Sequence, residues 1–347
     1  SVLNPVTQIE KDSIAFNIED GELKIISSPN SEALMWLAGF NPFATYSIDL
    51  GDITGSGKIG FQFSDPDGTE NFLATIIYEN SNLIDAEFNL QMNGKTIAEK
   101  SFSISAESRN LSKNKLIFQM LGSGLNLYLQ DQGHPIVIAQ LDFNEAIDLR
   151  EKSRIHKFQT SLYVAPKLGS IKIKNINVDF NAGMGLADIR AITYENGDPI
   201  LDDGRIWYTM SIRGRGLPHP LQGVFSMNPS VFDINFEGII VFDRGDGLWR
   251  NEVASHIFYD RRDSLWKGIT TGFSAYAQKG EKKQLLAIQS KKDPRFGFSV
   301  MYAKPMGQVG DIEDPHIIFD QNVGKYRILT CENSNTNGYK AIILESN

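Results

Sequence analysis

Residues 185–215, GLADIRAITYENGDPILDDGRIWYTMSIRGR, carry the pattern that decides the fold. In this stretch a short apolar run ends in an aromatic residue and an acid, a polar turn follows, and a second run carries a tryptophan. The pattern returns in ASHIFYDRRDSLWKGIT from Ala254 and in EDPHIIFDQNVGKYRILT from Glu313. The aromatic–acid pairs lie 65 and 60 residues apart; they are Tyr194 and Glu195, Tyr259 and Asp260, and Phe319 and Asp320. The aromatics of the second runs lie 59 and 60 residues apart; they are Trp207, Trp266 and Tyr326. A repeat of about sixty residues, built of strands and turns, predicts blades of a β-propeller, because one four-stranded sheet cannot bury its faces alone.

Bulk composition narrows the classes of function. The chain has 347 residues, 41% hydrophobic and 22% charged, which is typical of a globular protein of about two domains. A net charge of −8 does not attract phosphate backbones or anionic lipid, so we expect no nucleic acid and no membrane among the partners. No apolar run approaches the ~20 residues of a spanning helix. The single cysteine, Cys331, excludes an internal disulfide, and because Ser1 opens no charged and apolar leader, we expect any signal peptide to have been removed.

The part of the chain before the repeats alternates apolar and polar residues with the period of a strand. Residues 1–14 are polar and predict an N-terminal arm, and residues 15–180 contain about ten strands separated by turn sequences such as Asp65 to Gly68. A short helix is predicted at Asn144–Lys152, NEAIDLREK. Such a series predicts a two-sheet β-sandwich. The small residues 181–185 predict a junction, and residues 186–347 form the second predicted domain.

The strand rhythm of residues 15–180 and their closing strand, SIKIKNINVDF, resemble concanavalin-like, jelly-roll and laminin-G-type sandwiches. Such domains accompany many bacterial sugar hydrolases. The resemblance implies glycan binding through exposed aromatics, with Trp36 and Phe40 as candidates. In the alternative interpretation these aromatics belong to the core and the sandwich only supports the second domain.

The run IEDPHIIFDQNVGKYRILT resembles the blade-opening signature of five-bladed propeller glycoside hydrolases, in particular the family 43 arabinanase and xylosidase group and its furanosidase relatives. The run ADIRAITYENGD looks like the first-blade version, with Ile189 where a proline is usual. The resemblance implies that Asp188 is the general base and that Asp314 is the carboxylate that tunes the general acid. Inverting glycosidases place their acid and base roughly 6.5–9.5 Å apart, and residues that enter successive innermost strands of a propeller converge on one channel.

The family's general acid is a glutamate about one blade beyond Asp314, and residues 186–347 hold only about 2.7 repeats. We therefore expect the remaining blades on another segment or another chain. Within this chain, Glu313 and Glu252 are the alternative acids. Because consecutive strand residues face opposite sides, Glu313 and Asp314 are not expected to reach the channel together. Glu252 is equally well explained as a solvated turn acid.

Histidines and arginines complete the predicted site. His256 and His316 occupy equivalent repeat positions, where the resemblance implies contact with substrate; buried structural histidines are the alternative. Arg190, Arg213 and the nearby Arg215 suit the carboxylate of an acidic sugar, or else pair at the surface with Asp198, Asp202 and Asp203. No group of His, Asp and Glu has the spacing of metal ligands, so we expect neither a metal nor a cofactor.

The sequence thus predicts an all-β protein, a sandwich followed by a propeller. The predicted function is hydrolysis of a plant-type polysaccharide or oligosaccharide with a furanose or an acidic sugar at the cleaved end. A non-catalytic carbohydrate-binding protein and a glycoside phosphorylase are the alternatives. A polymeric substrate implies a periplasmic or extracellular location.

Overall fold

The computed structural model describes residues 14–26, 31–104, 110–143, 145–181, 185–213, 220–231, 233–273, 280–334 and 338–346. They form two compact units, Ser1–Asp179 and Phe180–Asn347. Nearly all of the predicted arm, most of the predicted junction, and Arg215 lie outside the described residues. No helix in the described ranges is long and apolar enough to cross a membrane.

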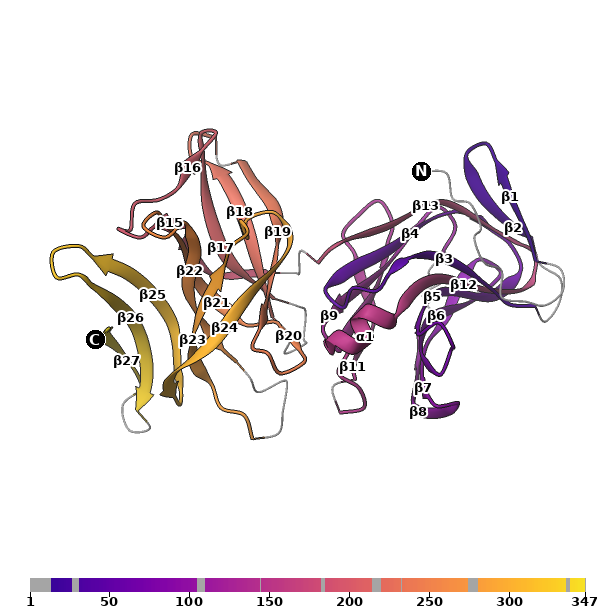
Figure 1. The fold of residues 1–347 in the computed structure, drawn as a ribbon. Coiled ribbons are helices and arrows are strands. Elements are labelled where there is room, and N and C mark those ends of the chain that lie inside the picture. Colours follow the sequence, from indigo (N-terminus) through magenta and orange to yellow (C-terminus); the bar gives the residue numbers. More distant parts are fainter. Residues whose placement is uncertain are drawn as a thin grey trace. The chain divides into compact units, whose positions relative to one another are not determined.

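The first unit is made of two sheets (Figure 1). One has seven strands in the order β1 (Ala15–Glu19), β2 (Glu22–Ile26), β13 (Ser170–Phe180), β4 (Ala44–Ile53), β9 (Lys115–Leu121), β10 (Gly124–Gln130) and β11 (Ile136–Asp142). The other has six, in the order β3 (Ala33–Gly39), β12 (Gln159–Leu168), β5 (Ser56–Ser64), β6 (Glu70–Glu79), β7 (Asn82–Met92) and β8 (Lys95–Ser103).

The two sheets of the first unit pack face to face through aromatic side chains. Tyr46 of β4 lies with its ring centre 5.6 Å from that of Phe61 and 5.0 Å from that of Phe63, both on β5. Phe118 of β9 meets Phe61 edge to face at 5.0 Å. Such contacts between residues on alternate positions of facing strands make the core of a two-layer β structure.

Two sequence-based expectations for this unit need correction. Phe40 is buried in the core and is no surface aromatic, whereas Trp36 is 42% exposed. The short helix, α1 (Lys152–Lys157), begins where the predicted helix ends. Asp148 accepts hydrogen bonds from the backbone N–H and the side chain of Arg150, and this local turn competes with helix before residue 151.

The second unit contains one sheet of eleven strands. Its path runs β14 (Gly185–Ala191), β17 (Arg205–Arg213), β18 (Leu221–Asn228), β19 (Asp233–Asp243), β24 (Gly297–Val309), β23 (Gln284–Ser290), β22 (Leu265–Gly272), β21 (Val253–Asp260) and β15 (Thr193–Tyr194). Two further short strands, β16 (Leu201–Asp202) and β20 (Trp249–Arg250), pair with β17 and β19. Because β14 and β15, the two ends of the path, are consecutive in the chain, the sheet is nearly closed and barrel-like.

The sixty-residue repeat predicted from the sequence appears in this topology. The first repeat supplies β14, β17, β18 and β19, the second supplies β21 to β24, and the third forms a separate sheet of β25 (Ile312–Asp320), β26 (Lys325–Ser334) and β27 (Gly338–Glu345). The first two repeats are joined into one sheet, because β19 and β24 pair in parallel, as do β15 and β21. Separate propeller blades are therefore not shown.

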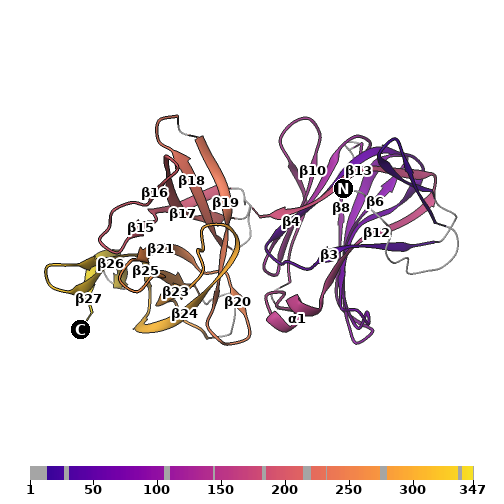
Figure 2. The same ribbon diagram turned by 45° about the horizontal axis from the view of Figure 1, so that its top comes forward.

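Equivalent residues of the first two repeats build a shared core. Trp207 and Trp266, the aromatics of the two second runs, lie in one buried cluster with Phe242 and Met301. The third repeat packs on the second, with β25 in contact with β21, β22 and β23 (Figure 2).

Candidate functional site

Each repeat opens with the same break in its first strand pair. The register shifts between Ala187 and Arg190 in β14, between Val253 and His256 in β21, and between Glu313 and His316 in β25. At each shift one residue has a positive φ: Asp188 at 55°, Ala254 at 57° and Asp314 at 57°. Such β-bulges turn the chain and re-aim side chains, and they are frequent beside active sites.

Hydroxyl groups of the preceding repeat hold two of these bulges. The N–H of Ala254 donates to the Ser211 hydroxyl of β17 at 3.1 Å, and the N–H of Asp314 donates to the Thr271 hydroxyl of β22 at 3.2 Å. Ser211 and Thr271 are 60 residues apart, so this contact repeats with the sequence period. The bulges are therefore part of the repeat and not local irregularities.

The structure brings Asp188 and Asp314 together with two arginines. Arg213 of β17 donates to the Asp188 carboxylate at 3.1 Å, and Arg190 of β14 lies 4.0 Å from the Asp314 carboxylate. Burial and then the negative charge of Asp188 raise the pKa of Asp314, while Arg190 and Arg213 lower it. The net result is a carboxyl group whose pKa is above its ordinary value and which is influenced by the charge of a second carboxylate.

The two predicted histidines stack on each other beside these residues. The ring centres of His256 and His316 are 3.8 Å apart. His256 is fully buried; its Nδ1 accepts the N–H of Ile317 at 3.2 Å, and its Nε2 lies 3.4 Å from the Thr193 hydroxyl. Burial lowers the pKa of His256 well below the usual value, helped by the charges of His316 and Arg190, and burial also lowers the pKa of His316. His256 therefore links the second repeat to Ile317 of the third repeat and to Thr193 of the first.

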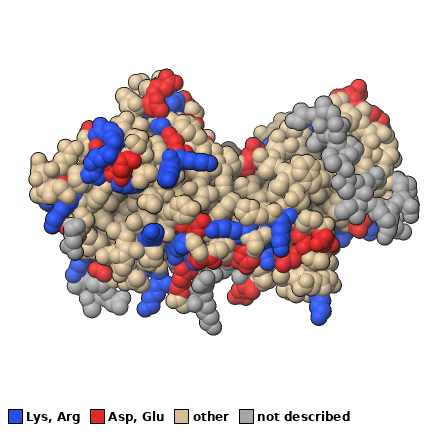
Figure 3. Space-filling model, in the orientation of Figure 1, with Lys and Arg blue, Asp and Glu red and all other residues tan. Residues whose placement is uncertain are grey.

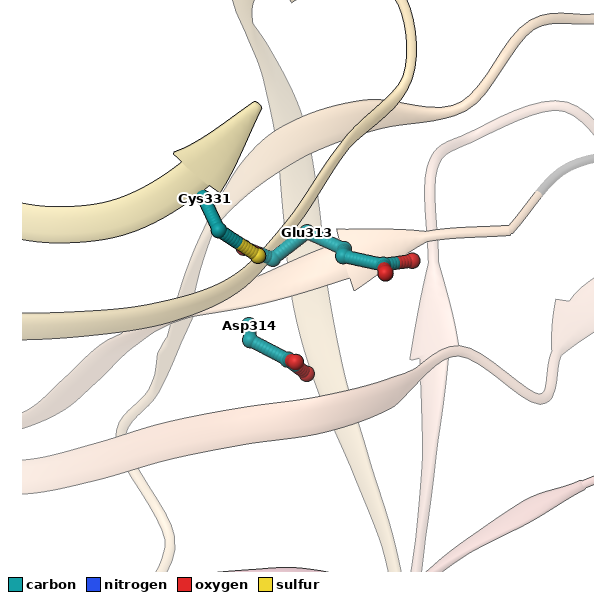
Figure 4. Close-up of side chains that lie close together, drawn as sticks. All are labelled: Glu313, Asp314 and Cys331. Atoms are coloured by element: carbon teal, nitrogen blue, oxygen red, sulfur yellow. The ribbon is translucent and has the colours of Figure 1, made fainter. Parts of the chain in front are cut away.

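Glu313 and Asp314 do not point to opposite sides, contrary to the expectation from strand alternation. Figure 4 shows their carboxylates extending in the same general direction from β25. Ligand atoms of Glu313, Asp314 and Cys331 lie within 4.8 Å of one another. The bulge and the left-handed backbone of Asp314 cancel the alternation.

This group of three is the candidate metal cluster among the described residues. Lys283, however, lies 2.7 Å from the Glu313 carboxylate and also bonds Asp311. An ammonium group in that place competes with a cation, so no metal is assigned to the cluster.

Glu252 belongs to a different environment from the one predicted. It is buried, pairs with the guanidinium of Arg244, and accepts the N–H of Phe273 at 2.7 Å. It is not a solvated turn acid. A buried carboxylate with such partners is typical of a structural ion pair.

The predicted alternative, in which the arginines pair at the surface with Asp198, Asp202 and Asp203, is not what the structure shows for Arg190 and Arg213. Arg190 and Arg213 face Asp314 and Asp188, while Asp202 pairs with Arg295 and Asp198 bonds Asn196. Because both guanidinium groups already face carboxylates, they offer little free charge to an acidic sugar.

The sequence analysis did not identify Ala254 as the bulge residue of the second repeat. This residue occupies in the second repeat the place that Asp188 and Asp314 hold in the first and third. It also missed that Arg190 stands two residues beyond the bulge, as His256 and His316 do. Aligning the repeats on the bulge instead of on the aromatic–acid pairs would have revealed both, because the first repeat has one extra residue between the two features.

Comparison with known proteins identifies no family for this chain: no family model matches it, and no curated protein sequence matches it. Solved structures resemble parts of it distantly. The carbohydrate-binding module CBM66 from Bacillus subtilis is 19% identical, covers 50% of this chain and 94% of its own, and gives a TM-score of 0.33. The GH43 endo-arabinanase from Bacillus licheniformis is 14% identical over 67% of this chain and 68% of its own, with a TM-score of 0.28. An inactivated mutant β-agarase B in complex with agaro-octaose is 7% identical over 47% of this chain and 77% of its own, with a TM-score of 0.33.

Proposed function

We propose that this protein acts on carbohydrate and that its second unit is a domain of the propeller-type glycoside hydrolase kind. The observation that carries the proposal is the meeting of Asp188 and Asp314, which lie at equivalent bulges of the first and third repeats and are close enough for the charge of one to raise the pKa of the other. Two carboxyl groups in unlike environments are the common requirement of glycosidic hydrolysis.

The contacts between the first strands of the repeats support the propeller interpretation. Strand β14 contacts β21, and β21 contacts β25, so equivalent strands gather side by side. In a propeller, innermost strands surround a channel in this way. In the proposed mechanism Asp188 takes a proton from water as general base, and the leaving glycosidic oxygen receives its proton from a general acid that Asp314 tunes; none of the described residues is assigned as that acid. The acid is not assigned to Glu313, whose carboxylate faces the Lys283 ammonium group.

The proposed substrate is a neutral plant-type glycan, with a furanose at the cleaved end as the first choice, because Arg190 and Arg213 are occupied by carboxylates. The proposed location is periplasmic or extracellular, where polymeric glycans are met. The face drawn in Figure 3 has basic and acidic side chains next to one another.

The test measures release of reducing ends from arabinan, xylan and their oligosaccharides. Asp188→Asn should lower turnover at least about 100-fold, the usual contribution of a general base, and Asp314→Asn should also lower turnover, because the acid loses its tuning carboxylate. Asp203→Asn, at an exposed turn, is the matched control and should leave turnover unchanged. Equal turnover in Asp188→Asn and the unmodified chain would reject the assignment.

Non-catalytic carbohydrate binding is the second candidate, favoured by one observation: Arg213 donates to the Asp188 carboxylate at 3.1 Å, so this carboxylate already has a hydrogen-bond partner. Retention of a glycan without any product identifies this function. Product that forms only when inorganic phosphate is added, as a sugar phosphate, identifies a phosphorylase.

A further inference from the structure

The six-stranded sheet of the first unit has one polar face. Ser161 pairs with Trp36 and with Gln62, Gln62 pairs with Leu73, and Leu73 pairs with Asn89. Paired residues lie on the same face, so this row crosses five strands from β3 to β7. At about 4.8 Å per strand the row spans roughly 19 Å. The opposite face carries the aromatic core, so this row faces away from it.

A pocket of about 200 Å³ lies on this face, over β5, β6 and β7. Its lining is mostly amides, a hydroxyl and carboxylates, among them Asn71, Thr75, Glu87, Asn89 and Gln91.

Gly60 of β5 pairs with Thr75 of β6. A Cβ at Gly60 would lie 2.0 Å from the Ala74 carbonyl oxygen, so the strand pairing admits no side chain there.

Two oxygen atoms in the pocket lining lack hydrogen-bond partners among the described residues: Thr75 Oγ1, on a fully buried side chain, and Asn71 Oδ1. Buried polar atoms in proteins are nearly always paired, so an orphan pair beneath a pocket indicates a missing donor. Lys58 of β5 and Glu87 of β7 form an ion pair across β6, with side chains 33% and 34% exposed. Both members of this pair line the same pocket as the two oxygens.

We propose that this pocket binds one unit of a neutral saccharide, and that Trp36 stacks on another unit of the same glycan farther along the row. Sugar hydroxyls donate as well as accept, so they can satisfy Thr75 Oγ1 and Asn71 Oδ1 while bonding the amide of Asn89. The lining carries one cation, Lys58, against the two carboxylates of Glu87 and Glu99, which disfavours a uronic acid. Trp36 is 42% exposed, and its Nε1 donates to the side chain of Gln159 at 2.7 Å.

The test is calorimetric titration of the whole chain with arabinohexaose, xylohexaose and cellohexaose, and with hexagalacturonate as the acidic probe. At least one neutral hexamer should bind, and hexagalacturonate should bind more weakly. Thr75→Val preserves shape and removes the orphan hydroxyl, so affinity should fall about tenfold, the value of one good hydrogen bond. The melting temperature of Thr75→Val should equal or exceed that of the unmodified chain, which separates lost binding from lost folding.

Asn175→Ala, an exposed amide on the seven-stranded sheet, is the matched control and should bind as the unmodified chain does. Glycan turnover should be lost in Asp188→Asn and the affinity of the pocket in Thr75→Val, so failure of this proposal and failure of the proposed hydrolysis are distinguishable. The inference is overturned if no neutral hexamer binds at millimolar concentration, if hexagalacturonate binds as tightly as the best neutral hexamer, or if Thr75→Val keeps full affinity because water alone satisfies its hydroxyl.

Discussion

Replacing Asp314 by glycine should stabilise the protein while removing its proposed activity. Asp314 has φ 57° at the bulge of β25, a left-handed conformation that costs a residue with a Cβ about 1–2 kcal/mol and costs glycine nothing sterically. Glycine in turn loses about 0.5–1 kcal/mol more chain entropy on folding. The backbone alone thus predicts a gain of roughly 0–1.5 kcal/mol in the free energy of unfolding.

The charge of Asp314 adds to this gain. Its pKa is raised by burial and by Asp188, so the folded state binds the proton more tightly than the unfolded state does. The ionised group therefore opposes folding above the folded pKa, and this effect disappears as the pH falls below the unfolded value near 3.9. The stability difference between Asp314→Gly and the unmodified chain should accordingly be larger at pH 7 than at pH 4.

The assay is urea unfolding at several pH values, with glycan turnover measured on the same preparations. Asp203→Gly is the matched control, because Asp203 has φ 49° at an exposed turn and measures the backbone contribution away from the site. A lower stability of Asp314→Gly than of the unmodified chain at pH 7 would refute the reasoning, since Asp314 would then be a net stabilising partner of Arg190.

Three further predictions concern residues inside one unit or the other. Gly60→Ala should unfold the first unit, because the new Cβ would meet the Ala74 carbonyl oxygen at 2.0 Å. The variant should therefore lack the sharp urea-unfolding transition of that unit, and a normal transition would contradict the prediction. Asp260→Asn should destabilise the second unit by about 2–3 kcal/mol, because the carboxylate is fully buried and accepts a hydrogen bond from Arg262 at 2.7 Å. The midpoint of urea unfolding measures this loss. A change below about 1 kcal/mol would show that solvent satisfies the basic partners of Asp260. His256→Gln should reduce the loss of unfolding free energy that occurs as the pH falls from 6.5 to 4.5. Because the pKa of His256 is lowered in the folded state, protonation of this residue favours unfolding below its unfolded pKa near 6.5. An unchanged dependence of stability on pH between 6.5 and 4.5 would count against a buried neutral histidine.

The repeat and the strand content were predictable from the sequence, because alternation and turn residues act locally. The interval of about sixty residues located Trp207 and Trp266, which the structure places in one core cluster. Their equivalence needed no knowledge of how the sheets associate.

Side-chain direction at the site was not predictable from alternation. Each bulge inserts residues into one strand of a pair, so Glu313 and Asp314 do not face opposite sides as the strand period requires. The sequence also did not predict that β19 pairs in parallel with β24 and so joins two repeats into one nearly closed sheet. These strands are distant in the chain, and local propensity does not specify which strands pair.

By itself, the sequence determined an all-β chain with three related segments and an acid at the opening of the first and the third. Only the tertiary structure decided which charges meet: Arg213 with Asp188, Arg190 with Asp314, and Arg244 with the buried Glu252. The physical reason is that strand order and register, not sequence distance, set which side chains share a low-dielectric neighbourhood, and charges interact strongly only there.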